Sequence, residues 1–170
     1  RLSMGATAQK VDPLIINFNG TATELSDQRF AFDLDADGDT EQIARPVGGS
    51  GFLAFDRDGD GRIRDGRELF GPQSGNGFAE LAALDDDGNG WIDEGDQAYQ
   101  RLRIWQPGMQ GTPLTSLSQA GVGAISTQAL ETPFLIKTTN QTTLGAVANT
   151  GVFLHENGQA GTIQHIDLTV

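Results

Sequence analysis

The feature that most constrains this chain is a set of acidic, glycine-containing segments between residues 33 and 96. The 170 residues include 23 Asp or Glu and 11 Lys or Arg, for a formal net charge of -12. Residues 33–96 hold 17 of the acids and five of the bases, so this part of the chain carries the whole net charge. Carboxylates this crowded repel one another. The segments must therefore be solvated or bind cations.

Composition excludes several classes of protein. The absence of cysteine excludes disulfides, zinc–thiolate sites and thiol nucleophiles. An apolar fraction of 37% with nine Phe is too high for a disordered acidic tail. No apolar run approaches the about 18 residues that a membrane-spanning helix needs, and no basic stripe is present to bind nucleic acid. The chain begins at Arg1 without a charged and then apolar leader, so we interpret it as a fragment or a processed form of a protein.

Residues 85–96 match the twelve-residue calcium loop of EF-hand proteins. Oxygen-bearing side chains stand at loop positions 1, 3, 5, 9 and 12: Asp85, Asp87, Asn89, Asp93 and Asp96. Gly90 falls at position 6, where the loop turns sharply, the carbonyl of Trp91 is the backbone ligand expected at position 7, and Ile92 is the apolar anchor at position 8. The departure is Asp96, where EF-hands carry Glu. The pattern predicts a calcium site, and a turn without metal is the alternative.

Residues 56–68 predict a second calcium site. Asp56, Asp58 and Asp60 occupy positions 1, 3 and 5, Gly61 occupies position 6, and the carbonyl of Arg62 and the side chain of Ile63 follow at positions 7 and 8. Position 12 is Arg67, so we expect a one-residue bulge that returns Glu68 to the ion. The two loops begin 29 residues apart. This spacing is typical of paired EF-hands, in which Ile63 and Ile92 would meet in a short β-bridge.

Residues 33–41 leave a third site open. Asp33, Asp35 and Asp37 repeat the spacing and Gly38 follows, but Thr40 stands at position 8 and no acid stands at position 12. If metal binds here, Glu41 or a carboxylate from elsewhere must complete its coordination, and the alternative is a solvated acidic turn. The sequence thus predicts Ca²⁺ as the cofactor, with two sites and an open third.

Apolar spacing predicts a single α+β domain over residues 1–170, in which paired EF-hand-like loops with short helices pack on antiparallel β-structure. The calcium-binding region is residues 33–105, and the β-rich flanks are residues 11–32 and 106–170. Helices are expected on both sides of residues 85–96, at 78–84 and 96–102, and one or two helical turns at 114–120. The expected strands are 11–18, 132–139, 150–155 and 162–170, with a hairpin near Asn157-Gly158.

An ordered set of motifs resembles a calcium-binding module of bacterial RTX-type and related secreted or surface proteins, called the self-processing module in some members. The motifs are GFLAFD at 51–56, GRELFG at 66–71, GFAEL at 77–81, DDDGNGWID at 85–93 and LRIW at 102–105. The resemblance covers roughly residues 12–130. It implies EF-hand-like calcium loops packed with β-structure, an extracellular or cell-surface location in bacteria, and a larger parent protein as partner.

The resemblance also implies calcium-dependent cleavage between Asp12 and Pro13, after which the aspartyl end can join a lysine amine. The Asp side chain can attack its own carbonyl carbon to form a cyclic anhydride, and the proline nitrogen is a comparatively good leaving group. Where the family usually continues with acids, this chain has Asn17-Phe-Asn19-Gly20. The alternative interpretation is that Asp12-Pro13 only starts a strand.

The sequence therefore predicts a calcium-binding module of a larger protein. Two alternatives stay open: autocatalytic processing at Asp12-Pro13, and an adhesion module that binds carbohydrate or protein. We assign no other catalytic residues. We identify no Ser, Cys or acid as a catalytic partner of His155 or His165, so we interpret both as structural, and we expect Trp91 and Trp105 to pack in the core.

Overall fold

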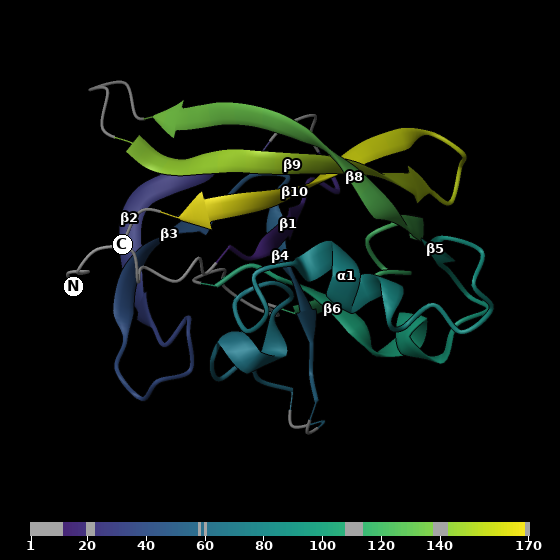
Figure 1. The fold of residues 1–170 in the computed structure, drawn as a ribbon, viewed down its shortest axis with the longest axis horizontal. Coiled ribbons are helices and arrows are strands. Elements are labelled where there is room, and N and C mark those ends of the chain that lie inside the picture. The colour runs from purple at the N-terminus through teal and green to yellow at the C-terminus, as the bar shows by residue number, and fades with distance from the viewer. Residues whose placement is uncertain are drawn as a thin grey trace.

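The computed structural model describes residues 12–19, 23–57, 59, 61–107, 114–137 and 143–168. They form an antiparallel eight-stranded sheet in the order β5-β8-β9-β10-β1-β4-β6-β7 and a two-stranded sheet of β2 and β3 (Figure 1). The strands of the large sheet are β1 (Leu14–Ile16), β4 (Gly51–Phe55), β5 (Trp91–Ile92), β6 (Leu102–Trp105), β7 (Leu114–Ser116), β8 (Val122–Lys137), β9 (Thr143–His155) and β10 (Ala160–Leu168). The small sheet pairs β2 (Leu25–Phe32) with β3 (Glu41–Pro46).

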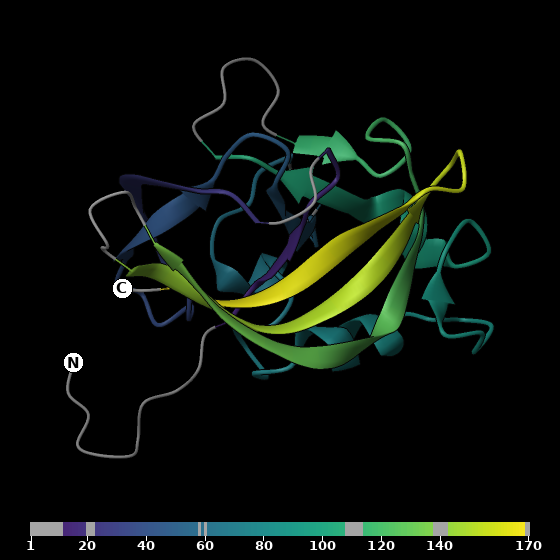
Figure 2. The same cartoon turned by 90° about the horizontal axis from the view of Figure 1, so that it is seen from above.

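Strands from both ends of the sequence meet at the centre of the large sheet. β1 pairs with β10 on one side and with β4 on the other. Figure 2 shows β8, β9 and β10 side by side, forming a long curved part of the sheet. The predicted β-rich character of the chain is confirmed, and the hairpin predicted near Asn157-Gly158 is the one that joins β9 to β10.

The central strands are apolar on both faces because each face packs against its own core. Leu14 and Ile16 of β1 belong to one hydrophobic cluster, which also contains Phe78 of α1 (Gly77–Ala82). Ile15, between them, belongs to a second cluster, with Phe32 of β2. Neighbouring residues of a strand point to opposite faces. The continuous apolar runs at residues 14–16 and 51–55 are therefore typical of a central strand rather than a surface strand.

The predicted fold class is wrong: this is a β-rich fold and not an α+β fold built on paired EF-hands. Among the described residues the one α-helix is α1, and residues 66–68 and 97–101 form short 3₁₀ turns, η1 and η2. Loop 56–68 follows strand β4, whose residues Gly51–Phe55 are all buried, where an EF-hand would have a helix. The segment expected as a helix at 96–102 forms η2 and then β6, which pairs with β4.

The predicted bridge between Ile63 and Ile92 is also wrong. Ile92 lies in β5, which pairs with Ser126 and Ile125 of β8, and its side chain is buried in the first cluster. Ile63 packs against the second cluster. The two loops therefore pack on different cores and do not form an EF-hand pair.

Smaller differences follow the same trend toward β-structure. Residues 114–116 form β7 and only 117–120 form a turn, where one or two helical turns were expected. Trp105 packs in the core as predicted, 8% exposed and with its ring 5.0 Å from that of Phe32. None of the helices in the described part of the chain is long and apolar enough to cross a membrane.

Candidate functional site

Loop 85–96 folds its acidic side chains inward. One ligand oxygen from each of three carboxylates lies within 4.8 Å of the others: Asp85, Asp87 and Asp96. Asp96 is 2% exposed, and its Oδ1 and Oδ2 accept hydrogen bonds from the backbone N–H groups of Asp86 (2.6 Å) and Asp93 (3.0 Å). These bonds turn Asp96 into the loop and explain why it does not cap η2.

The other predicted ligands of this loop lie close by. The Asn89 side chain donates from Nδ2 to Oδ2 of Asp93 (3.3 Å), and its Oδ1 accepts from the backbone N–H of Trp91 (2.9 Å). Trp91 is half-buried and begins β5, so the sheet holds the backbone at loop position 7. Asn89 and Asp93 therefore stand beside each other, outside the group of three carboxylates.

Loop 33–41 gathers four carboxylates. One oxygen from each lies within 4.8 Å of the others: Asp33, Asp35, Asp37 and Glu41. The Asp33 side chain holds the turn by accepting from the N–H groups of Asp37 (3.0 Å) and Gly38 (2.9 Å). Oε1 of Glu41 accepts from the N–H of Leu34 (2.9 Å). Glu41 was one of the candidates to complete this site, and the structure places it beside the three aspartates.

Electrostatics at both groups favour a positive partner. Burial, and then the neighbouring Asp37 carboxyl, raise the pKa of Asp35. Burial also raises the pKa of Glu41, and the charges of the three aspartates around it add to that effect. A hydrogen bond with Asp85 is the largest cause that raises the pKa of Asp87. In each of these carboxyl groups, burial or a hydrogen bond to a second carboxyl raises the pKa, and the charges of neighbouring carboxylates add to the effect. A divalent cation relieves the same repulsion.

Loop 56–68 is described in part. Asp58 and Asp60 lie outside the described residues. Oδ2 of Asp56 accepts from the N–H of Gly61 (2.8 Å), at loop position 6. Glu68 is 6% exposed and faces back into the loop, with its two oxygens accepting from the N–H groups of Arg64 (2.8 Å) and Arg57 (3.2 Å). Residues 66–68 take up the extra length as η1, and the Glu68 carboxylate contacts the backbone of Arg57, the residue that follows Asp56. Arg62 is exposed at position 7.

Two buried oxygens test whether a cation fits these loops. Oδ1 of Asp56 and Oδ1 of Asp85 are buried and have no hydrogen-bond partner among the described residues. Both residues stand at position 1 of their loops, and in both the other oxygen is held by the position-6 glycine N–H. A buried carboxylate oxygen without a partner is costly. A hard cation such as Ca²⁺, which binds carboxylate oxygens, would supply that partner.

Segment 65–71 connects two of the loops to the start of β1. Asp33 and Asp65 form a parallel bridge, and the N–H of Gly66 donates to the carbonyl of Asp33 (2.9 Å). At the other end of the segment, the carbonyl of Phe70 accepts from the N–H of Leu14 (2.9 Å). Loops 33–41 and 56–68 are therefore joined to each other and to the residues that follow Asp12-Pro13.

The peptide bond between Asp12 and Pro13 is buried. Asp12 is 2% exposed, its Oδ2 lies 3.6 Å from Nδ1 of His165, and its Oδ1 is buried without a hydrogen-bond partner among the described residues. The Pro13 carbonyl accepts from the N–H of Ile166 (3.0 Å). A Cβ placed on Gly71 would lie 2.0 Å from the carbonyl oxygen of Asp12, so the backbone of residue 71 packs directly on the carbonyl group.

His165 is the residue of this site that sequence reasoning missed. The sequence indicates a structural role because it does not show which acid His165 contacts, and only the pairing of β1 with β10 brings the residue to Asp12. A register shift between His165 and Ile166 in the pairing with β9 accompanies this placement.

Asn17, which replaces an acid of the family pattern, is fully buried. Its Oδ1 accepts from Ser50 (2.8 Å) and its Nδ2 donates to Thr162 (2.8 Å) and Gln164 (3.1 Å). Both the oxygen and the nitrogen of its amide are thus already hydrogen-bonded within the protein.

Comparison with known proteins places these sites in context. The family model of the SPM domain matches residues 14–169, which is nearly the whole chain. The iron-regulated protein FrpA of Neisseria meningitidis serogroup C is 31% identical over an alignment of 131 residues, and the match covers 67% of this chain and 12% of that protein. The chain therefore spans about an eighth of the length of this relative.

Proposed function

This chain belongs to the SPM domain family, and we propose that it is a calcium-binding module of a larger secreted or surface bacterial protein, folded or rigidified by Ca²⁺. The small share of FrpA that the chain spans supports a larger parent protein. The resemblance of its motifs to modules of secreted and surface proteins supports the extracellular location. The loops at 85–96 and 56–68 each bind one ion, and the four carboxylates of loop 33–41 form a third site.

The observation that carries the proposal is the pair of unpartnered oxygens at position 1 of two loops. Loop 85–96 has Oδ1 of Asp85 buried without a partner beside two further carboxylates, and loop 56–68 has the same atom of Asp56 in the same state. A solvated acidic turn would expose these oxygens to water. Calcium takes six to eight oxygen ligands at about 2.3–2.6 Å, so the inward-facing carboxylates and loop carbonyls suit it.

Substitution within loop 85–96 tests the proposal. Asp85→Asn is expected to remove one calcium ion per chain, because a neutral amide replaces the carboxylate at position 1, and native mass spectrometry counts the ions. The matched control is Glu94→Gln, which removes the same charge from the same loop at an exposed residue outside the carboxylate group. This control should keep the wild-type number of ions. Equal ion counts in both variants would mean that the loop does not bind calcium through Asp85.

A second function, calcium-dependent cleavage between Asp12 and Pro13, is favoured by a specific observation. The Asp12 carboxylate is buried, one of its oxygens has no partner among the described residues, and the carbonyl that it would attack packs against Gly71. Segment 65–71 joins that carbonyl to loops 33–41 and 56–68. Calcium that orders the loops would therefore also order the Asp12-Pro13 bond.

The cleavage proposal predicts that the wild-type chain releases residues 1–12 after calcium is added, leaving a fragment that begins at Pro13. Mass spectrometry identifies both products. Asp12→Asn should stay intact, because its amide cannot form the cyclic anhydride. A wild-type chain that stays intact for hours in millimolar calcium would contradict this second function and would leave the calcium-binding proposal standing.

A further inference from the structure

His165 lies between the Asp12 carboxylate and the start of α1. Its ring is 3% exposed, with Nδ1 3.6 Å from Oδ2 of Asp12 and Nε2 accepting a hydrogen bond from the backbone N–H of Gly77 (3.0 Å). Because Nε2 is an acceptor in this bond, the proton of a neutral imidazole must reside on Nδ1. The Gly77 N–H therefore selects the tautomer that directs an N–H toward Asp12.

We infer that His165 is a positioning residue for cleavage after Asp12, an inference that rests on the processing activity proposed above. Its Nδ1–H holds Oδ2 of the Asp12 carboxylate and leaves Oδ1, the oxygen without a hydrogen-bond partner among the described residues, free to attack. The 3.6 Å separation is longer than a hydrogen bond. Hydrogen bonds between reacting groups are often this long before the reactive complex forms.

The reaction balances with water as the second reactant. Oδ1 of Asp12 forms a bond to the carbonyl carbon of the same residue, and the bond from that carbon to the Pro13 nitrogen breaks. The nitrogen takes a proton from water as it leaves, and the resulting hydroxide opens the cyclic anhydride to a carboxylate and a carboxylic acid. His165 gives up no proton in these steps, because the Gly77 N–H occupies Nε2 and provides no replacement proton. Its role is to orient the nucleophile.

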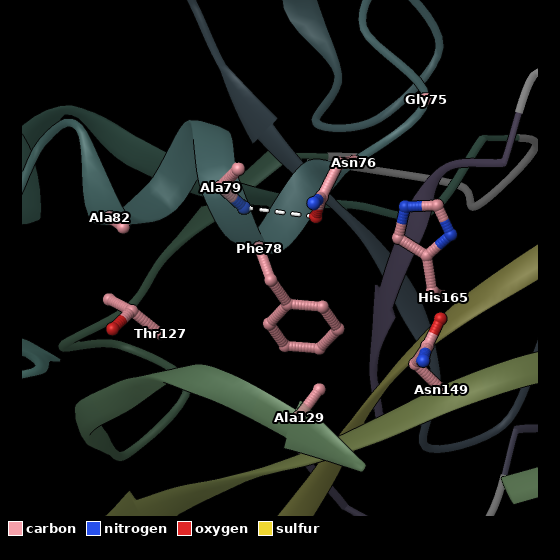
Figure 3. A pocket seen from close by; sticks show the side chains of 9 residues that line it. All are labelled: Gly75, Asn76, Phe78, Ala79, Ala82, Thr127, Ala129, Asn149 and His165. Carbon is pink, nitrogen blue, oxygen red and sulfur yellow. Dashed lines mark hydrogen bonds between the residues drawn. The ribbon is translucent and has the colours of Figure 1, made fainter. Parts of the chain in front are cut away.

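A cavity large enough to hold water lies beside the ring. Figure 3 shows His165 at one end of this cavity, of about 410 Å³, with Phe78 and Ala79 of α1 on one side and Ala129 and Asn149 of β8 and β9 on the other. Asp12 is buried and is not among the residues that line this cavity. The cavity thus brings solvent close to His165 while the nucleophile is kept from bulk solvent.

Two substitutions separate positioning from a purely structural role. In His165→Gln the side-chain amide reaches the place of Nε2, so it can accept from Gly77 but offers no donor to Asp12. In His165→Asn the shorter amide places its NH₂ near the position of Nδ1, so it can donate to Asp12 but cannot reach Gly77. With full-length chains in calcium, release of residues 1–12 should slow about 100-fold in His165→Gln. His165→Asn should cleave at a rate closer to wild type.

The reverse order of rates would overturn the inference, because a structural role requires the bond to Gly77 and is better met by Gln. Cleavage of His165→Gln at the wild-type rate would overturn it as well. The melting temperature and calcium count of each variant, measured on the same samples, show whether the fold is intact. If the wild-type chain itself does not cleave, the processing function fails instead, so the two failures are distinguishable.

Discussion

Removal of calcium is expected to lower the melting temperature of the chain by roughly 10–20 °C. At free Ca²⁺ about a hundredfold above Kd, each independent site adds roughly 2.7 kcal/mol to the free energy of unfolding, so two sites add about 5 kcal/mol. In a domain of this size, each kcal/mol shifts the melting temperature by about 2–4 °C. The carboxylates that repel one another in loops 33–41 and 85–96 give the physical reason. Thermal unfolding in calcium and in EDTA measures the shift.

The loop variants provide the internal control for this experiment. Asp85→Asn has lost one site, so its melting temperature should fall less on chelation than that of wild type, whereas Glu94→Gln should fall by the wild-type amount. If wild-type chains in calcium and in EDTA melt at the same temperature, calcium does not stabilise the fold.

Substitution of Gly71 is expected to have the next largest effect, on both stability and cleavage. Residue 71 has a φ of 113°, and a Cβ there would lie 2.0 Å from the Asp12 carbonyl oxygen. In Gly71→Ala the positive φ costs roughly 1–2 kcal/mol and the overlap about 1–3 kcal/mol, so the melting temperature should fall by roughly 4–20 °C. Release of residues 1–12 should stop, because the carbonyl carbon is displaced from the carboxylate that attacks it.

Gly158→Ala is the matched control. Residue 158, in the turn between β9 and β10, also has a positive φ, 91°, but a Cβ there meets no atom of the described residues within 4 Å. This variant should therefore lose only about 1–2 kcal/mol and should keep the wild-type rate of cleavage. Equal melting temperatures and equal rates in the two variants would contradict the close contact between Gly71 and Asp12.

Local patterns in the sequence predicted individual elements better than they predicted the fold. The turn at Asn157-Gly158 and the helix near Phe78 depend on nearby residues, and both elements are present. The choice between helix and 3₁₀ turn after Asp96 depends instead on contacts with distant parts of the chain. Residues 102–105 pair with β4, so the segment forms η2 and then β6 rather than an EF-hand helix.

The pairing of strands was the part that the sequence could not supply. Ile92 has the position of an EF-hand bridge residue, but β5 joins β8, whose pairing segment lies more than 30 residues further along the chain. For the same reason, the sequence did not reveal the contact at the second candidate site, the Asp12-Pro13 bond. Asp12 was recognisable from Asp12-Pro13, whereas the contact with His165 exists only because β10 returns beside β1. The spacing of acidic residues identified candidate ligands in all three loops. The hydrogen bonds that Glu68 and Glu41 accept from backbone N–H groups are evident only in the folded structure.

The central claim is that the acidic loops bind calcium, and a count of ions per chain tests it most directly. Native mass spectrometry of the full chain in calcium, before and after chelation, provides that count. We expect one bound ion in each of loops 56–68 and 85–96. An ion held by the four carboxylates of loop 33–41 brings the count to three. A chain that carries no calcium ion at millimolar free calcium would contradict the account.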